Sequence, residues 1–335
     1  MAEAPRKPSA KTALLLGLKI LLSLALFAWL FANVKWENIE TTIAHARPEW
    51  LVGAFLLLFT SNLGGTLQWN RLLRAAGIEL PFWKVVGYYH VGLFFNNFLP
   101  ANVGGDFARI LDASRASAAS RATAFSTVLL DRMIGTVALA SLAVLTTLPA
   151  IDQFHLAAIY TGVLGFFCLS VFMLWAILHP RLLASIEVIL DRVGLGRLKP
   201  ALDQLSEQLA LYRGQRRLFM ELFAIALSVQ VMRIGVHVLV GRALGLDVET
   251  AYFFLFVPLL AVIVSLPISF NGIGVREGAG ILLFGLVGLD RGSAFSLQFT
   301  TYLVAFAVSL IGGVVFLVRI PHRRAESRIP RRPEE

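Results

Sequence analysis

Long apolar runs separated by short polar segments dominate the hydrophobic pattern of the chain. A helix needs roughly 20 apolar residues to cross a bilayer, and several runs approach or exceed that length. The predicted full spans are 12–34, 50–69, 122–150, 156–178, 218–240 and 294–318. The pattern therefore predicts an all-α polytopic membrane protein with a single transmembrane domain over residues 1–335.

Two further apolar stretches, 85–108 and 251–289, are broken where their polar residues cluster. Each contains a Leu-Pro pair followed by glycines, with the proline at Pro100 in the first stretch and Pro267 in the second. Proline removes a backbone donor and breaks a helix, and glycine permits conformations that other residues avoid. Freed backbone groups in lipid need partners inside the protein or in a water-filled cavity. We therefore expect each stretch to line such a cavity.

The basic residues set the predicted orientation. The chain carries 30 Lys and Arg against 21 Asp and Glu, a formal net charge of +9. Most of these cations lie between apolar runs or at the termini, which is the positive-inside pattern of membrane proteins, so we expect no nucleic acid partner. Both termini, the loop 179–217 and the basic tail 319–335 are predicted to be cytoplasmic. The loop contains an amphipathic helix, for which the membrane interface and packing on the protein are both open.

The number of full crossings must be even if both termini lie inside. Six full spans with two re-entrant helix pairs satisfy this condition, and so do eight plain spans. In the first arrangement, 85–108 enters from the cytoplasm and 251–289 from outside, with Asn102 and Asn271 near the two tips. Broken segments in matching positions of an inverted repeat are typical of transporters and point to the substrate site. The half-repeats are predicted at about residues 12–150 and 156–318.

Ionisable residues within the apolar stretches form the candidate site. A charge at the bilayer centre costs about 2.5–3.5 kcal/mol on insertion scales, so such residues usually face a cavity or one another. Arginine suits an anionic headgroup because its planar fork donates two parallel hydrogen bonds to phosphate. The alternative is that the charged pairs are structural salt bridges. The candidate substrate-binding residues are Asn97, Asp106, Arg109, Asp131, Arg132, Asn271, Arg276 and Glu277.

Arg233 and His237 are also ionisable residues within a predicted span. They are four residues apart and therefore share one helix face. We interpret His237 as a packed or hydrogen-bonded residue rather than as a ligand.

Sequence signatures of enzymes are absent. The chain has no GxSxG, HExxH or P-loop motif and no GxGxxG motif after a strand. Its single cysteine, Cys168, excludes an intrachain disulfide and a cysteine cluster for zinc. We therefore expect no enzymatic activity, no cofactor and no metal.

Three motifs together resemble a known family. They are Leu99-Pro100 through Gly104-Gly105-Asp106 and Arg109; Asp131-Arg132-Met133-Ile134-Gly135; and Leu266-Pro267 through Gly272, Gly274 and Arg276-Glu277. Their order and spacing are similar to those of the flippase-like transmembrane family, the lysylphosphatidylglycerol synthase transmembrane region of the multiple peptide resistance factor. The resemblance covers nearly the whole chain and implies translocation of a modified phospholipid or lipid-linked sugar across the inner membrane. The chain ends before the aminoacyl-transfer domain of the full synthase, so we expect no aminoacyl-lipid synthesis.

Three functional hypotheses follow. The first is a flippase-like protein of the bacterial inner (cytoplasmic) membrane that moves an anionic (phospho)lipid or lipid-linked sugar between leaflets. Its expected partners are the bilayer and an anionic lipid headgroup, and a homo-oligomer or a lipid-modifying enzyme partner is left open. The second is a membrane-embedded lipid transferase, or an accessory subunit of one, with Asp106, Asp131 or Glu277 as acid or base. The third is a small-solute secondary transporter.

Overall fold

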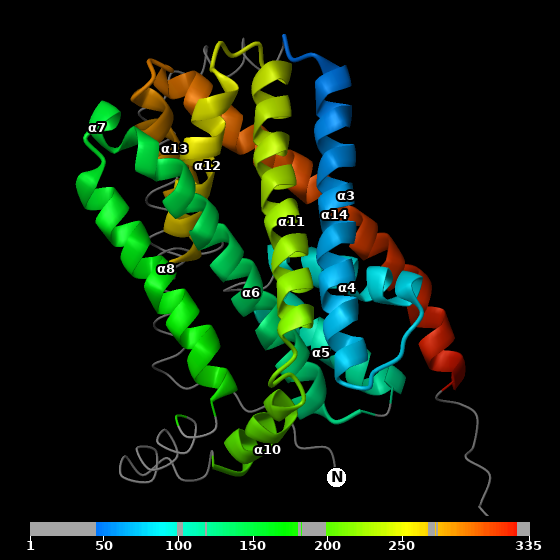
Figure 1. Cartoon of the computed structure of the whole chain (residues 1–335). Helices are drawn as coiled ribbons and strands as arrows, with labels where there is room; N and C mark the ends of the chain where they lie inside the picture. The colour runs from blue at the N-terminus through cyan, green and yellow to red at the C-terminus, as the bar shows by residue number, and fades with distance from the viewer. Residues whose placement is uncertain are drawn as a thin grey trace, which may run out of the picture.

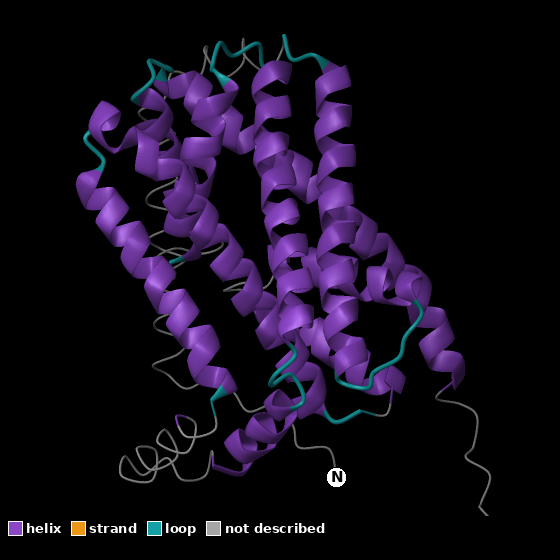
Figure 2. Cartoon of the chain, in the orientation of Figure 1, coloured by secondary structure: helices purple, strands orange, loops and turns teal. Residues whose placement is uncertain are grey.

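All the regular secondary structure of the described residues is helical. The computed structural model describes residues 45–98, 103–117, 119–179, 182, 199–266, 272 and 274–326. Within these ranges there are helices and connecting loops but no strand (Figure 2). A helix satisfies its own backbone hydrogen bonds, which is the requirement that a lipid environment imposes. The prediction of an all-helical fold is therefore confirmed for the described residues, and this fold is consistent with a polytopic membrane protein.

Five helical segments within the described ranges are long and apolar enough to cross a membrane. Each coincides with a span predicted from the hydrophobic pattern, and the remaining predicted span, 12–34, lies outside the described residues. The short helices η2 (Leu148–Ala150) and α7 (Ile151–Phe154) continue one of the five, α6. The five are α3 (Pro48–Ala75), α6 (Arg121–Thr147), α8 (Ala157–Leu178), α11 (Arg216–Ala243) and α14 (Arg291–Glu326).

The first broken stretch forms two helices that lie against each other. α4 (Phe82–Phe98) and α5 (Val103–Ser117) are separated in the chain rather than continuous. The backbone N–H of Gly105 donates to Asn96 Oδ1 at 2.9 Å. A methyl group at Gly105 would overlap with the carbonyl oxygen of Gly92, so only glycine allows this close approach. The stretch is therefore a helical hairpin.

The second broken stretch has the same form. It contains α12 (Thr250–Ser265) and α13 (Val275–Gly285). The ring of Phe284 on α13 lies 5.4 Å from that of Phe253 and 5.3 Å from that of Phe256, both on α12. These aromatic contacts hold the two helices side by side over the upper part of the bundle.

The two hairpins lie in opposite halves of the molecule. Figure 1 shows α4 and α5 in the lower half, and α12 and α13 in the upper half. α3 descends to the first hairpin and α6 ascends from it, whereas α11 ascends to the second hairpin and α14 descends from it. This reversal is what an inverted repeat requires. The re-entrant position of the hairpins in a bilayer, the number of spans and the half-repeat boundaries stay predictions.

Helix α14 contacts both hairpins. The guanidinium carbon of Arg276, on α13, lies 5.1 Å from the ring centroid of Tyr302. Further along α14, the Nδ2 of Asn97, on α4, donates to Ser309 Oγ at 2.7 Å. Tyr302 and Ser309 are seven residues apart on one helix, a rise of about 10 Å. The two hairpins therefore approach each other at this part of α14, while the predicted tips Asn102 and Asn271 lie outside the described residues.

The amphipathic helix of the 179–217 loop packs on the protein. It is α10 (Lys199–Ala210), and its residue Leu209 is fully buried together with Tyr212 in the following turn. The hydroxyl of Tyr212 donates to the carbonyl oxygen of Leu72 at 3.0 Å. Burial raises the pKa of Tyr212, so the hydroxyl stays protonated and available as a donor. Of the two alternatives for this helix, its buried residues favour packing against the lower end of the bundle.

Candidate functional site

Four of the predicted site residues form one network of ion pairs between α5 and α6. Arg109 Nη1 lies 3.0 Å from Asp131 Oδ2, and Arg109 Nη2 lies 2.8 Å from Asp106 Oδ1. Arg132 donates to the same Asp106 carboxylate through Nη2 at 2.9 Å and through Nε at 3.0 Å. The four formal charges cancel within the network.

Arg109 is the buried centre of this network. Its side chain is only 4% exposed, and its guanidinium carbon lies 5.0 Å from the ring centroid of Trp69 and 5.1 Å from that of Tyr89. Two carboxylates and two aromatic faces therefore surround the cation. Arg109 consequently joins α3, α4, α5 and α6 at one point.

The carboxylate of Asp131 is held from a second side by α3. Gln68 Nε2 donates to Asp131 Oδ1 at 2.9 Å and to the Asp131 carbonyl oxygen at 3.1 Å. One turn earlier on α6, Thr127 Oγ1 accepts from Trp69 Nε1 at 3.0 Å. These bonds fix the rotation of α6 relative to α3 and direct Asp131 into the bundle.

Asp106 and Arg132 form the more accessible edge of the network. Their side chains are 19% and 46% exposed, compared with 4% for Arg109. Arg132 donates two hydrogen bonds to the Asp106 carboxylate, and a guanidinium can bind a phosphate in the same bidentate way. This edge is therefore the part of the network that a ligand could contact.

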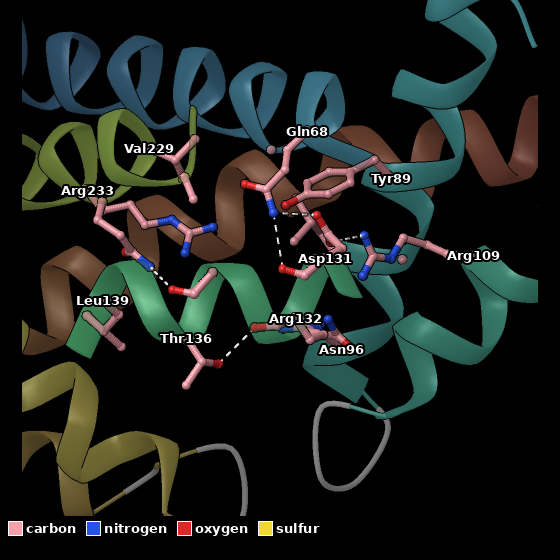
Figure 3. A pocket seen from close by; sticks show the side chains of 16 residues that line it. Gln68, Tyr89, Asn96, Arg109, Asp131, Arg132, Thr136, Leu139, Val229 and Arg233 are labelled. Carbon is pink, nitrogen blue, oxygen red and sulfur yellow. Dashed lines mark hydrogen bonds and ion pairs between the residues drawn. The ribbon is translucent and has the colours of Figure 1, made fainter. Parts of the chain in front are cut away.

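A cavity of about 230 Å³, here called the lower cavity, lies against the network. Its wall is formed by residues of α3, α4, α5, α6 and α11 (Figure 3). Its polar lining includes Gln68, Tyr89, Asn96, Arg109, Asp131, Arg132, Gln230 and Arg233. A polar cavity inside an apolar helical bundle is the setting in which membrane proteins bind polar ligands.

A second cavity of about 370 Å³, here called the upper cavity, brings the two hairpins together. Asn97 reaches it from the first hairpin, and Val264 and Arg276 reach it from the second. Its volume is in the range of ligand pockets, roughly 300–1,000 Å³. The rest of its polar lining comprises Asn62, Asn96, Arg233, His237, Thr301, Tyr302 and Ser309.

The predicted site residues therefore separate into groups. Arg109, Asp131 and Arg132 line the lower cavity, and Asp106 bonds to both of these arginines. Asn97 and Arg276 line the upper cavity. Asn271 lies outside the described residues.

Glu277 is buried at the start of α13. Its Oε2 accepts the backbone N–H of Gly274 at 2.7 Å, and its side chain is 3% exposed. A carboxylate in the first turn satisfies a free backbone donor and complements the positive end of the helix dipole. In this structure Glu277 stabilises the start of the helix that carries Arg276.

Arg233 lies in the site although it is not among the substrate-binding residues predicted from the sequence, where it stands out only as an ionisable residue within a span. It lines both cavities, as do Leu93 and Asn96. The available signal was an arginine in the middle of an apolar span, since α11 continues for two to three turns beyond it. Sequence alone does not show which face of α11 borders a cavity, so its position at the junction emerges only from the fold.

The donor set of the site suits an anion rather than a metal. Within the described ranges, no group of three or more His, Cys, Asp and Glu side chains could hold a metal ion. Arginine is the predominant charged residue in the lining of both cavities, and guanidinium groups bind phosphate and carboxylate.

The chain is similar to several UPF0104 membrane proteins. A UPF0104 membrane protein of Pyrococcus horikoshii is 24% identical over 310 residues, covering 84% of this chain and 91% of the relative. A UPF0104 membrane protein of Methanothermobacter thermautotrophicus is 24% identical over 289 residues, covering 80% of this chain and 85% of the relative. A third UPF0104 membrane protein, from Methanocaldococcus jannaschii, is 27% identical over 127 residues, covering 38% of this chain and 37% of the relative. No solved structure matches the chain.

A family model gives the broadest match. It is described as the lysylphosphatidylglycerol synthase TM region, and it matches residues 16–313. This range includes both hairpins, both cavities and all three motifs on which the resemblance was based. The resemblance is therefore confirmed, and the protein belongs to the lysylphosphatidylglycerol synthase TM region family.

Proposed function

We propose that the protein translocates a lipid with an anionic headgroup between the leaflets of the cytoplasmic membrane. The observation that carries this proposal is the meeting of the two helical hairpins at the upper cavity, which contains arginines and adjoins the arginine-lined lower cavity within an apolar bundle. Charged groups inside a membrane bundle are expensive unless they serve a substrate path or pair with one another. The headgroup would enter the cavities while the acyl chains stay in the surrounding lipid.

The arrangement of the helices supports transport. The hairpins lie in opposite halves of the bundle, between helices that run in opposite directions (Figure 1). Transporters built in this way bind substrate where the broken segments meet and expose the site alternately to the two sides. Membership of a family named for a lipid synthase favours a lipid over a small solute.

The carboxylates are poorly placed for a transferase mechanism. A general base must lie within hydrogen-bond reach of the substrate proton. Asp106 and Asp131 are each engaged by arginine, and Glu277 is engaged by a backbone N–H. We therefore propose that the chain is not an enzyme, and that an ion gradient, the membrane potential or consumption of the lipid drives translocation.

The test uses the full chain reconstituted in phosphatidylcholine vesicles with a trace of fluorescent phosphatidylglycerol. A membrane-impermeant reductant bleaches only the outer leaflet, so translocation appears as additional bleaching over time. We expect faster bleaching than in protein-free vesicles and in vesicles with an unrelated helical membrane protein. Bleaching equal to that in the controls would contradict the proposal.

Mass spectrometry of the extracted lipid provides the second readout. A flippase leaves the mass of the lipid unchanged, whereas a transferase produces a covalently altered species. A new lipid mass that depends on the protein and a donor substrate would favour the transferase hypothesis instead.

A further inference from the structure

We propose that Arg233 binds the phosphodiester group of the transported lipid, at the junction of the lower and upper cavities. The inference rests on the proposed function and deepens it in two respects. It assigns the anion contact to one residue, and it specifies a headgroup with a single negative charge on a phosphodiester.

The surroundings of Arg233 differ from those of the network arginines. Arg109 and Arg132 donate to carboxylates at 2.8–3.0 Å. Among the residues that the structure describes, no carboxylate forms an ion pair with Arg233. In Figure 3 its guanidinium extends into the pocket, and no dashed line reaches it. The guanidinium N–H donors of Arg233 are therefore available to a ligand at the position where both cavities meet.

The position of Arg233 along α11 prevents its guanidinium group from reaching the membrane surface. It lies ten residues before Ala243, where α11 ends. Ten residues of helix rise about 15 Å, which is further than an arginine side chain can extend to reach the headgroup region. The charge must therefore be compensated inside the bundle, and a bound anion would provide that compensation.

The formal charges of the described residues indicate how many negative charges the ligand carries. The arginines that line the cavities are Arg109, Arg132, Arg233 and Arg276. The neighbouring acids are Asp106 and Asp131, which pair with Arg109 and Arg132, and Glu277, which directly follows Arg276 in the chain. Within the described part of the chain, one positive charge is therefore in excess. A phosphodiester carries one negative charge, whereas a phosphomonoester carries about 1.5 to 2 near neutral pH.

A side-chain amide next to Arg233 provides a further donor for the headgroup. Asn62 lines the upper cavity together with Arg233. Arginine binds two phosphate oxygens in parallel, and amides donate to ester or hydroxyl oxygens without adding charge. This combination suits a phosphodiester linked to a polar alcohol.

The test measures lipid binding rather than transport. The full chain is purified in detergent and titrated, by native mass spectrometry, with lipids that carry identical acyl chains. The lipids are phosphatidylglycerol, phosphatidic acid and a neutral glucosyl diacylglycerol. We expect phosphatidylglycerol to bind more tightly than either of the others. Equal binding of the neutral glycolipid would overturn the phosphodiester assignment, and tighter binding of phosphatidic acid would overturn the single-charge assignment.

Three variants then test whether Arg233 binds the lipid. Arg233→Gln should weaken phosphatidylglycerol binding by about tenfold or more, since it removes charge-assisted hydrogen bonds to the phosphate. Arg233→Lys should retain part of the affinity, because it keeps the charge but loses the fork. Arg242→Gln is the matched control, since this exposed arginine lies on the same helix, over the Trp50 ring at 5.8 Å. Unchanged binding in both Arg233 variants would overturn the assignment.

A competition experiment distinguishes the lipid from its soluble headgroup. Glycerophosphoglycerol carries the same phosphodiester without acyl chains. We expect it to compete only at far higher concentration than the lipid, and equal potency would overturn the assignment to a lipid. Binding through Arg233 without translocation in vesicles would contradict the proposed function and leave this site standing. Unaltered binding in Arg233→Gln would contradict the site and leave the proposed function standing.

Discussion

The guanidinium of Arg109 joins two carboxylates that are 25 residues apart in the chain, Asp106 and Asp131, at 2.8 and 3.0 Å. Because Asp106 also binds Arg132, this contact ties α5 to α6 at two points. The aromatic rings of Trp69 and Tyr89 complete the surroundings of the cation. Arg109 therefore positions the first hairpin, and its Nη1 and Nη2 both donate to carboxylates within the protein.

Arg109→Ala should strongly destabilise the protein. Removing one partner of a buried ion pair costs about 3–5 kcal/mol, because it leaves the other charge buried and uncompensated. The measurement is the thermal unfolding temperature of the purified protein in detergent, together with its accumulation in cells. Arg71→Ala is the matched control, since Arg71 pairs with Glu221 where both side chains are more than 40% exposed. Such a pair contributes only about 0–1 kcal/mol. Equal stability of the two variants would show that the Arg109 network does not hold the bundle together.

Gly312→Ala should disrupt the contact between α14 and α4. An added methyl group would overlap with the carbonyl oxygen of His90, and a backbone atom cannot move aside as a flexible side chain can. Overpacking of this kind costs roughly 1–3 kcal/mol, so we expect a lower unfolding temperature. Gly162→Ala, on α8, provides the comparison because no atom lies within 4 Å of the added methyl group. In that variant, stability should stay the same or rise by up to about 1 kcal/mol.

The lower end of the bundle in Figure 1 is predicted to be cytoplasmic. Single cysteines replace Glu79, between α3 and α4, and Asp247, between α11 and α12, in a Cys168→Ser background. Both positions are exposed. A membrane-impermeant maleimide should label Asp247→Cys in intact cells and Glu79→Cys only after permeabilisation. The reverse pattern would invert the topology.

The helices were predictable because apolar length alone identifies a membrane span. α8 matches its predicted bounds within one residue, whereas α3 continues to Ala75 and α11 begins at Arg216. These extensions are polar and lie beyond the apolar runs, so hydropathy does not detect them. The hairpins were predictable because Pro and Gly interrupt the apolar pattern in matching places.

The partners within the site were less predictable. Asp131 and Arg132 are adjacent in sequence, yet each pairs with a different residue of α5. The choice depends on how α5 and α6 are rotated, and that is fixed by contacts such as the one from Gln68 to Asp131. Arg233 reaches the site only through the packing of α11 beside α3 and α6, which no local pattern of the chain encodes.

The central claim is that both hairpins line one water-accessible headgroup site inside the membrane. The most direct test places single cysteines at Asn97, on α4, and at Val264, on α12, in the Cys168→Ser background. Each is labelled with a small, charged, water-soluble maleimide in phosphatidylcholine vesicles, with Leu164→Cys on the outer surface of α8 as the lipid-facing control. The account predicts that both hairpin cysteines react, that the control does not, and that adding phosphatidylglycerol slows both reactions together. Failure of both cysteines to react, or protection of only one of them, would contradict a shared site.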